Sequence, residues 1–370
     1  MRDTPLLHTP LYAEHLALKA RMVPFTGYSL PVQYAGIVEE HTAVRTAVGL
    51  FDVSHMGELR VDGPEALALV DGLITNDIMG LADGQARYTL CCNAEGFPLD
   101  DLIVYRVSPT RVMVVCNAAN RAKIVGHFTR SLEGKATVTD ISDDTALIAV
   151  QGPKALKLLQ EAGCDPQVTA LPAFHFAEAR ILNVPVTVSR TGYTGEDGAE
   201  LMCPPAQAAT LWRGLLALGA AYGARPCGLG ARNTLRLECK MALYGNDIDE
   251  TTPPLAAGLG WAVKLDKGPF VGREAIAATK AAGLPDKLVG FEVTDRAIAR
   301  DGWEVLDADG TKIGRVTSAS PSPTLGKNIG LAYVPVALGA LGTPLRLRDP
   351  ARGREAGAVV VATPFYKRAR

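Results

Sequence analysis

Hydrophobic positions along this chain recur with two spacings, one typical of helices and one typical of strands. A period near 3.6 residues predicts helices at residues 37–48, Lys154–Ala162, Gln207–Tyr222 and Gly272–Ala282. Short β-branched or apolar runs predict strands at Arg111–Cys116, Ala146–Val150, Val186–Arg190 and, as one extended segment, residues 50–61. Helices follow several of the strands, so the sequence predicts a protein that mixes both kinds of element.

The pattern changes near residue 283. The last predicted helix ends at Gly283, Pro285 follows, and no long helical pattern occurs beyond it. Short strand-like runs and turn signals such as Asp307–Gly310 fill roughly 80 residues, which is typical of a small antiparallel barrel or sandwich. We therefore expect one region at residues 1–282 and a C-terminal β domain at residues 286–370, since 370 residues are too many for one ordinary core.

Composition and charge argue against several functional classes. A net charge of −1 gives no basic field for nucleic acid, and no apolar run of about 18 residues predicts a membrane span. The N-terminus has no apolar segment typical of a secretory signal. Seven cysteines without a CxxC pair and six scattered histidines argue against a metal site and favour reduced, buried cysteines in the cytoplasm.

The stretch "SRTGYTGEDGAEL", residues 189–201, has three glycines spaced by three but matches no phosphate-binding loop, because no GK[ST] ends it. Its glycines permit positive φ and close backbone approach, which would leave Tyr193 and Glu200 projecting from a bent edge. A carboxylate can accept both the N–H and the neighbouring NH2 of an amino-pyrimidinone ring, while tyrosine offers a stacking surface. A plain hairpin with solvated acids explains the same residues, so this stretch alone leaves both interpretations open.

Two adjacent acids open the strand-like part of "CNAEGFPLDDLIVYR", residues 92–106. Because strand side chains alternate, one acid is expected to face solvent and the other to face inward. Asp101 shares its face with Ile103 and Tyr105, so we expect Asp101 to be shielded and its pKa to rise, as suits a group that handles protons. The open alternative is a turn acid beside a solvated acid.

Further candidates lie in "FDVSHMGEL", residues 51–59, and "GLGARNTLRLE", residues 228–238. His55 alone is more typical of a hydrogen-bonded structural histidine than of a catalyst. On a helix that starts after Gly230, Arg232 is placed to bind a ligand carbonyl or carboxylate, while Arg236 with Glu238 is explained equally well by a structural pair.

Six motifs occur in order from residue 51 to 327: "FDVSHMGE", "NAEGFPLDDLIVY", "VSRTGYTGEDGAEL", "GLGARNTLRLE", "ALYGNDIDE" and "TSASPSPTLGK". Together they make the chain closely resemble the T proteins of the glycine cleavage system, which are aminomethyltransferases that use tetrahydrofolate. The resemblance also includes "TPLYAEH" near the start and "PFYK" near the end, so it covers essentially the whole length.

The resemblance implies an α+β class, with a three-lobed folate-binding fold, antiparallel sheets flanked by helices, and a C-terminal β-barrel. It implies transfer of a methylene carbon from the aminomethyl-dihydrolipoyl arm of the lipoylated H protein to tetrahydrofolate, with release of ammonia and formation of 5,10-methylenetetrahydrofolate. By motif, Asp101 matches the catalytic carboxylate beside the folate nitrogens, and Glu200 matches the acid that recognises the pterin. The remaining positions that match the folate channel or its closure are Arg232, Tyr193, Tyr88, Ile103, Tyr105 and the terminal Arg370.

Two other functions within this fold were weighed. Folate-binding proteins that assist iron–sulfur cluster assembly carry "KGCYxGQE", whereas this chain has "KGPFVGREA" with Pro269 in place of the cysteine. A stand-alone folate-dependent demethylase is the second alternative, and the intact "FDVSHMGE" favours the glycine system over it. Phe174 and His175 stand where many relatives have tyrosines, and Ala319 replaces a frequent glycine. A net charge near zero is compatible with a local charged surface that attracts an acidic carrier protein.

Overall fold

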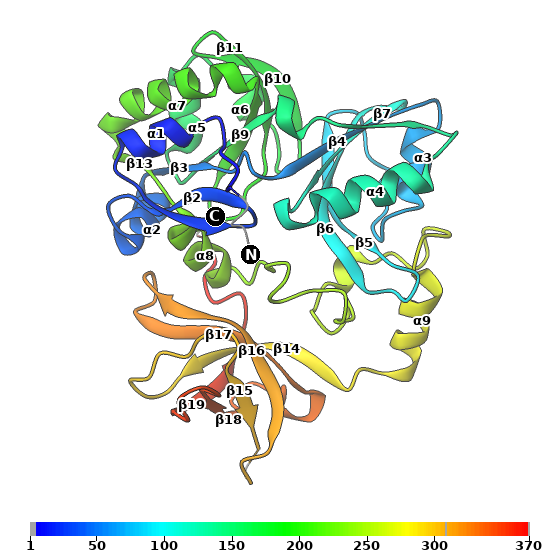
Figure 1. Cartoon of the computed structure of the whole chain (residues 1–370), viewed down its shortest axis with the longest axis vertical. Helices are drawn as coiled ribbons and strands as arrows, with labels where there is room; N and C mark the ends of the chain where they lie inside the picture. Colours follow the sequence, from blue (N-terminus) through cyan, green and yellow to red (C-terminus); the bar gives the residue numbers. More distant parts are fainter. Residues whose placement is uncertain (1–4, 308, 369–370) are drawn as a thin grey trace. The chain divides into compact units, whose positions relative to one another are not determined.

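The computed structural model (Figure 1) describes residues 5–307 and 309–368. The chain divides into two compact units. The first unit contains the described residues up to Asp71, then Asp77–Thr89 and Leu102–Asn233. The second unit contains Gly72–Asn76, Leu90–Asp101 and the described residues from Thr234 onward. This division is not the linear one expected from the sequence, and the boundary between residues 282 and 286 stays a prediction.

A six-stranded sheet forms one half of the first unit, in the order β10-β11-β12-β9-β3-β13. Its strands pair antiparallel except for β13, which runs parallel to β3. The strand bounds are β3 Val48–Asp52, β9 Ala146–Gln151, β10 Phe176–Ile181, β11 Val184–Ser189, β12 Gly198–Cys203 and β13 Ala224–Pro226. Helices α5 and α7 cover one face of this sheet (Figure 1), and Trp212 on α7 is fully buried against it.

A five-stranded sheet follows the order β5-β6-β7-β4-β8. Its strand bounds are β4 Gly57–Asp62, β5 Gln85–Cys92, β6 Pro98–Ser108, β7 Arg111–Cys116 and β8 Thr137–Asp140. Strands β5 and β6 cross the division between the units, which falls between Asp101 and Leu102 in β6. Leu59 and Val61 on β4 alternate with Glu58 and Arg60, and both apolar side chains are fully buried.

The helices and the short N-terminal hairpin complete the two units. The α-helices are α1 Tyr12–Ala17, α2 Ile37–Thr46, α3 Ala66–Asp71, α4 Arg121–Ser131, α5 Ala155–Glu161, α6 Pro166–Thr169, α7 Pro205–Gly219, α8 Leu229–Glu238 and α9 Arg273–Ala282. The 3-10 turns are η1 Ala118–Asn120, η2 Ser142–Asp144, η3 Ala220–Tyr222, η4 Gly260–Ala262 and η5 Val336–Leu338. The hairpin pairs β1 Arg21–Phe25 with β2 Tyr28–Gln33.

The C-terminal part of the second unit is a closed barrel with the strand order β14-β17-β16-β15-β18-β19. Its strands are β14 Asp286–Val293, β15 Glu304–Leu306, β16 Lys312–Ser322, β17 Lys327–Pro335, β18 Pro344–Arg348 and β19 Glu355–Val361. Closure comes from the pairing of β14 with β19, which leaves the sheet without an open edge. The predicted α+β class, with antiparallel sheets, helices and a C-terminal barrel, is confirmed.

One element prediction is wrong. Residues 50–61 were expected to form one extended segment, but they form parts of β3 and β4, which belong to different sheets. The chain turns at residues 53–56, where the backbone N–H of Met56 donates to the carbonyl of Val53. The Ser54 N–H also donates to the Asp52 carboxylate, 3.0 Å away. The apolar run in the sequence is therefore two strand ends joined by a turn whose donors are satisfied locally.

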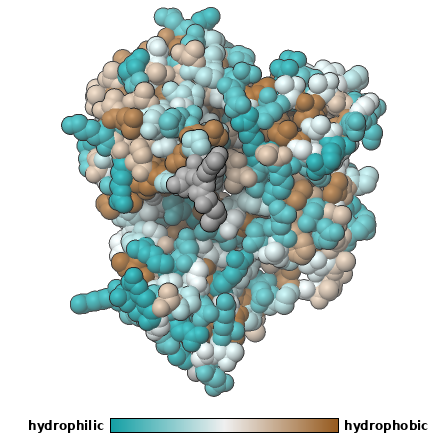
Figure 2. All heavy atoms as spheres, in the orientation of Figure 1, coloured by the Kyte–Doolittle hydropathy of each residue, from teal (hydrophilic) through white to brown (hydrophobic). Residues whose placement is uncertain are grey.

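On the face drawn in Figure 2, hydrophobic atoms are scattered among hydrophilic ones. In the part of the chain that the structure describes, no helix is both long and apolar enough to cross a membrane. Within residues 5–307 and 309–368, no group of three or more His, Cys, Asp or Glu side chains is placed to hold a metal ion.

Candidate functional site

The glycine-spaced stretch forms a tight loop that leads into β12. Gly195 adopts a φ of 79°, which glycine tolerates far better than other residues. At Gly192 a Cβ would stand 2.1 Å from a side-chain oxygen of Gln151, and at Gly198 it would stand 2.2 Å from the carbonyl oxygen of Val150. Close approach at two positions and a left-handed backbone at the third therefore account for the glycine spacing.

Buried side chains from outside the loop hold it in place. Gln151 accepts a hydrogen bond from the Thr194 hydroxyl, 2.8 Å away, and donates to the carbonyls of Thr191 and Ala199. Arg45 on α2 donates to the Thr194 carbonyl and pairs with Glu196 at 2.9 Å, with side chains only 7% and 4% exposed. Contacts from α2 and β9 thus hold the loop, as a rigid binding edge requires.

Glu200 lies on β12, and its carboxylate is fixed by a hydroxyl group. The Thr191 hydroxyl donates to Glu200 Oε2 over 2.5 Å. Because Thr191 gives its proton to Glu200, the Ser189 hydroxyl donates to Thr191 Oγ1 at 2.9 Å, and Ser189 Oγ lies 3.4 Å from the phenolic oxygen of buried Tyr105. This chain of hydroxyl groups joins two predicted site residues, Glu200 and Tyr105, within the first unit.

Tyr193 and Arg232 are also brought together. The Arg232 guanidinium lies 4.6 Å from the centroid of the Tyr193 ring, a cation–π geometry. Burial lowers the pKa of Arg232, while Tyr193 and Glu200 oppose this shift. Glu200 is thus close enough to act electrostatically on Arg232, so three predicted binding residues form one cluster.

His55 is buried beside this cluster and stays neutral. Burial, followed by the charge of Arg232, lowers the pKa of His55 to about 4. Its ring packs edge-on against Phe25 and Tyr28. The expectation of a hydrogen-bonded histidine fails at Nδ1, which has no partner among the residues that the structure describes.

Arg232 also borders a small cavity of about 10 Å³, together with Asp52 and Cys227. The Asp52 carboxylate accepts hydrogen bonds from Thr9 at 2.6 Å and from His15 at 2.8 Å. Burial raises the pKa of Asp52, but the His15 and Thr9 bonds outweigh it and leave that pKa below its usual value. These hydrogen bonds hold Thr9 and His15 of the N-terminal segment against Asp52, near the start of α8.

Strand β6 carries Asp100 and Asp101, and the expectation that Asp101 faces inward while Asp100 faces solvent is wrong. Asp100 is the fully buried member at 0% exposure, whereas Asp101 is half-buried. Both faces of β6 are largely covered, since Leu102 and Val104 are buried on one side and Tyr105 on the other. A simple alternation between core and solvent therefore does not apply to this strand.

The remaining predicted residues have these positions. Ile103 on β6 and Tyr88 on β5 are half-buried and belong to the first unit, whereas Asp101 belongs to the second. Arg370 lies outside the described residues. Arg236 pairs with Asp247 at 2.6 Å in full burial, and its structural pairing with Glu238 stays a prediction.

Sequence reasoning missed several residues that support the cluster. Thr191 fixes Glu200, and Arg45 with Gln151 fixes the loop; no local motif around these residues marks such roles. Glu58 lies inside "FDVSHMGE" but was overlooked in favour of His55. Glu58 is fully buried.

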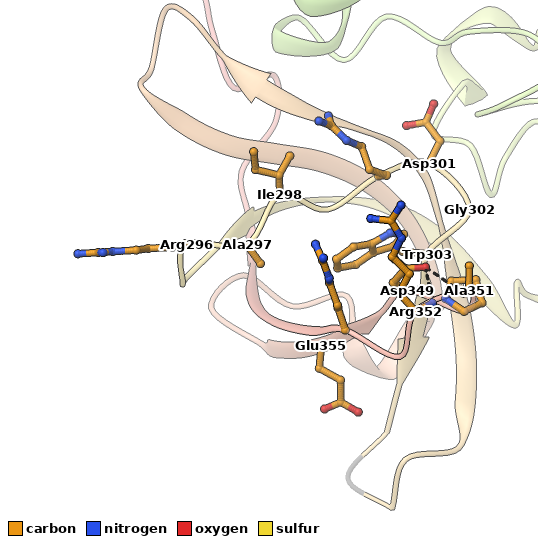
Figure 3. A pocket seen from close by; sticks show the side chains of 13 residues that line it. Arg296, Ala297, Ile298, Asp301, Gly302, Trp303, Asp349, Ala351, Arg352 and Glu355 are labelled. Atoms are coloured by element: carbon orange, nitrogen blue, oxygen red, sulfur yellow. Dashed lines mark hydrogen bonds between the residues drawn. The ribbon is translucent and has the colours of Figure 1, made fainter.

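The barrel carries a separate hollow lined by arginines. Side chains from residues 296–303 and 349–355 surround a cavity of about 1120 Å³ that includes Trp303 and three acids, Asp301, Asp349 and Glu355 (Figure 3). Asp349 accepts from the backbone N–H groups of Ala351 and Arg352, which shapes the hairpin. We call the exposed arginines here the arginine cluster; among described residues they form no ion pair, and they are Arg296, Arg300, Arg352 and Arg354.

Comparisons with known proteins agree with this architecture. The model of the GCVT N-terminal domain matches residues 11–267, and the model of the glycine cleavage T-protein C-terminal barrel domain matches residues 287–367. The aminomethyltransferases of Shouchella clausii and Symbiobacterium thermophilum are 47% and 48% identical, with 99% and 98% of both chains covered.

A solved structure leads to the same family. The glycine cleavage system aminomethyltransferase T from Bartonella henselae superposes with a TM-score of 0.91 and 33% sequence identity, and 98% of each chain is covered. Both family models and full-length relatives thus match the whole chain rather than one part of it. This chain belongs to the glycine cleavage T-protein family.

Proposed function

We propose that this protein is the aminomethyltransferase of the glycine cleavage system. It takes the methylene carbon from the aminomethyl-dihydrolipoyl arm of the lipoylated H protein, passes it to tetrahydrofolate and releases ammonia. The observation that carries the proposal is the match to full-length aminomethyltransferases at 47–48% identity. In this chain the Thr191 hydroxyl holds the Glu200 carboxylate in position. A cytoplasmic location stays a prediction.

The Glu200 cluster fits the ring edge of a reduced pterin. The Thr191 hydroxyl occupies one lone pair of Glu200 Oε2, and Oε1 accepts from no described residue. The carboxylate therefore retains acceptor sites for the adjacent N–H and NH2 groups, in the bidentate manner of charge-assisted pairs. Tyr193 supplies an aromatic surface and Arg232 a cation.

Asp101 has the catalytic role in this proposal. It would hold the folate amines in position and stabilise the positive charge that develops as nitrogen attacks the methylene carbon. Positioning of this kind can contribute on the order of 7–11 kcal/mol to lowering the barrier. Ile103, Tyr105 and Tyr88 would line the channel around the same ligand.

A coupled assay tests the function directly. Aminomethylated lipoyl carrier and tetrahydrofolate are supplied together, and ammonia and 5,10-methylenetetrahydrofolate are measured. We expect release of ammonia that depends on tetrahydrofolate, at equal stoichiometry with the methylene product. Release that is independent of tetrahydrofolate, or no release, contradicts the proposal. Replacement of the carrier by dimethylglycine or sarcosine tests the demethylase alternative.

Glu200→Gln is expected to raise the Kd for tetrahydrofolate at least tenfold. The amide has one acceptor oxygen and presents N–H groups to the ligand's own donors, so at least one charge-assisted bond, worth about 1.5–3 kcal/mol, is lost. Titration by intrinsic fluorescence or calorimetry measures the change. The matched control is Glu178→Gln, an exposed acid on β10 of the same sheet. An unchanged Kd for Glu200→Gln would remove Glu200 from the site.

The arginine cluster suggests where an acidic carrier approaches. Its members gather around Trp303, although Arg296 extends away from the other side chains in Figure 3. Unpaired cations at an exposed hollow attract an acidic protein and accelerate its encounter. We therefore propose this surface of the barrel as a docking region for the H protein.

Arg352→Glu with Arg354→Glu is expected to raise the KM for the carrier several-fold at low salt and to leave the KM for tetrahydrofolate unchanged. The effect should shrink as salt is added, because exposed charges are screened within about 10 Å at 0.1 M. Steady-state kinetics at several salt concentrations measure it, with exposed Arg130→Glu on α4 as the control. Equal KM values for both variants would place docking elsewhere.

A further inference from the structure

Glu58 on β4 is a buried acid without a partner. Its side chain is 0% exposed, and neither Oε1 nor Oε2 has a hydrogen-bond partner among the residues that the structure describes. Its backbone is held firmly, because its N–H donates to the Ser142 hydroxyl at 2.8 Å and its carbonyl accepts from Ile141 at 2.9 Å. Native proteins rarely leave such a group unsatisfied, so it needs a physical explanation.

The register of the sheet shows which face carries Glu58. Glu58 stands opposite Val115 on β7, and Val115 stands opposite Ile103 on β6. Directly opposed residues project to the same face of a sheet, and Tyr105 shares that face two residues after Ile103. Glu58 therefore lies on the face of two residues that we assign to the folate channel, while Leu59 projects to the opposite face.

Glu200 lies within electrostatic range of this face. Burial chiefly raises the pKa of Tyr105, and the nearby carboxyl groups of Glu200 and Glu58 add to this shift, which places the three side chains in one neighbourhood. Burial, and to a lesser degree the charges of Asp140 and Glu200, raise the pKa of Glu58 well above its usual value against the opposing charge of Arg121. Glu200 thus disfavours a second negative charge beside it.

The cation that acts electrostatically on Glu58 makes no hydrogen bond to it. Arg121 donates instead to Asp140 at 2.9 Å and to both oxygens of Asp143. An ionised carboxylate without a cation or hydrogen-bond donors is too costly to keep in a buried site. Glu58 is consequently a carboxylic acid with an O–H group that no described residue accepts.

We propose that Glu58 is a ligand-binding residue: a neutral carboxylic acid that donates a hydrogen bond to an acceptor atom of the reduced pterin. This inference rests on the proposed function. The pyrimidinone edge has two donors, the ring N–H and the NH2, flanked by acceptors, the carbonyl oxygen and a ring nitrogen. A carboxylate, Glu200, matches the donors, and a neutral acid nearby matches a flanking acceptor. A buried acid kept neutral in order to donate is an established device in enzymes.

Three proteins test the role of Glu58: the unchanged chain, Glu58→Gln and Glu58→Leu. Glutamine keeps a neutral donor, so its Kd for tetrahydrofolate is expected to stay within about threefold. Leucine removes the donor and leaves the ligand acceptor unpaired, so the Kd is expected to rise about tenfold. Leucine should also maintain or raise the melting temperature of the free protein, because an unsatisfied polar group has been removed. Leucine with a lower melting temperature and an unchanged Kd would establish a purely structural role.

Infrared difference spectra give a second readout that does not depend on the leucine variant folding. The unchanged protein should show the carbonyl band of a protonated carboxyl group that Glu58→Gln lacks, and this band should shift when tetrahydrofolate binds. A band that does not respond to tetrahydrofolate overturns the inference. Glu200→Gln separates the two proposals: weak binding by Glu200→Gln with normal binding by Glu58→Leu refutes only the role of Glu58. Failure of the unchanged protein to bind tetrahydrofolate refutes both.

Discussion

Asp101→Asn is expected to lower kcat by about 10²–10⁴-fold, the usual contribution of one well-placed acid–base group. Asparagine has nearly the same shape, but it carries no charge to stabilise the positive nitrogen that forms during transfer. In the proposed site the pterin edge is bound by Glu200 rather than by Asp101, so the Kd for tetrahydrofolate should change little. The coupled assay measures kcat, and equilibrium titration measures the Kd.

The control for Asp101→Asn is Glu95→Gln, which removes an exposed acid from the turn that precedes the same strand. This control should retain full activity. Turnover by Asp101→Asn at the rate of the unchanged protein would show that Asp101 is not the catalytic carboxylate. A loss of both turnover and tetrahydrofolate binding would instead show that Asp101 acts mainly in holding the ligand.

Much of the fold could be predicted because local patterns in this chain agree with the final structure. The β-branched run at Arg111–Cys116 forms β7 with the same bounds, and the helix expected at residues 207–222 is α7, Pro205–Gly219, extended by a 3-10 turn. Leu211 and Leu215 point into the core, as their spacing predicts. Helix α7 was predicted correctly because one of its faces is buried and prolines mark its start.

The residues of the candidate site that lie in sequence motifs could be predicted. Tyr193, Glu200 and Arg232 were each singled out from their own stretches, and the structure brings them into one cluster. Their support was not predictable, because Thr191 and Arg45 act through contacts that depend on the path of the loop. Asp100 was misjudged because β6 is covered on both faces, so it buries a polar position that alternation assigns to solvent.

Asp247→Ala is expected to lower the free energy of unfolding by about 3–5 kcal/mol, the usual result of removing one member of a buried ion pair. Asp247 is 0% exposed, and it accepts from Arg236 at 2.6 Å, from the Thr317 and Ser318 hydroxyls and from the Leu243 N–H. Its removal takes away the carboxylate 2.6 Å from the buried Arg236 guanidinium. The Ser318 hydroxyl and the Met241 carbonyl, to which Arg236 also donates, cannot neutralise that charge.

Asp249→Ala is the matched control, since Asp249 pairs with Arg315 at 3.4 Å with both side chains partly exposed. Exposed pairs contribute about 0–1 kcal/mol, so this variant should unfold close to the unchanged protein. Urea denaturation followed by circular dichroism measures both variants. Because Asp247 joins the end of α8 to strand β16, its loss should also accelerate amide hydrogen exchange in β16. Equal unfolding free energies for the two variants would mean that the polar network, and not the ion pair, stabilises this junction.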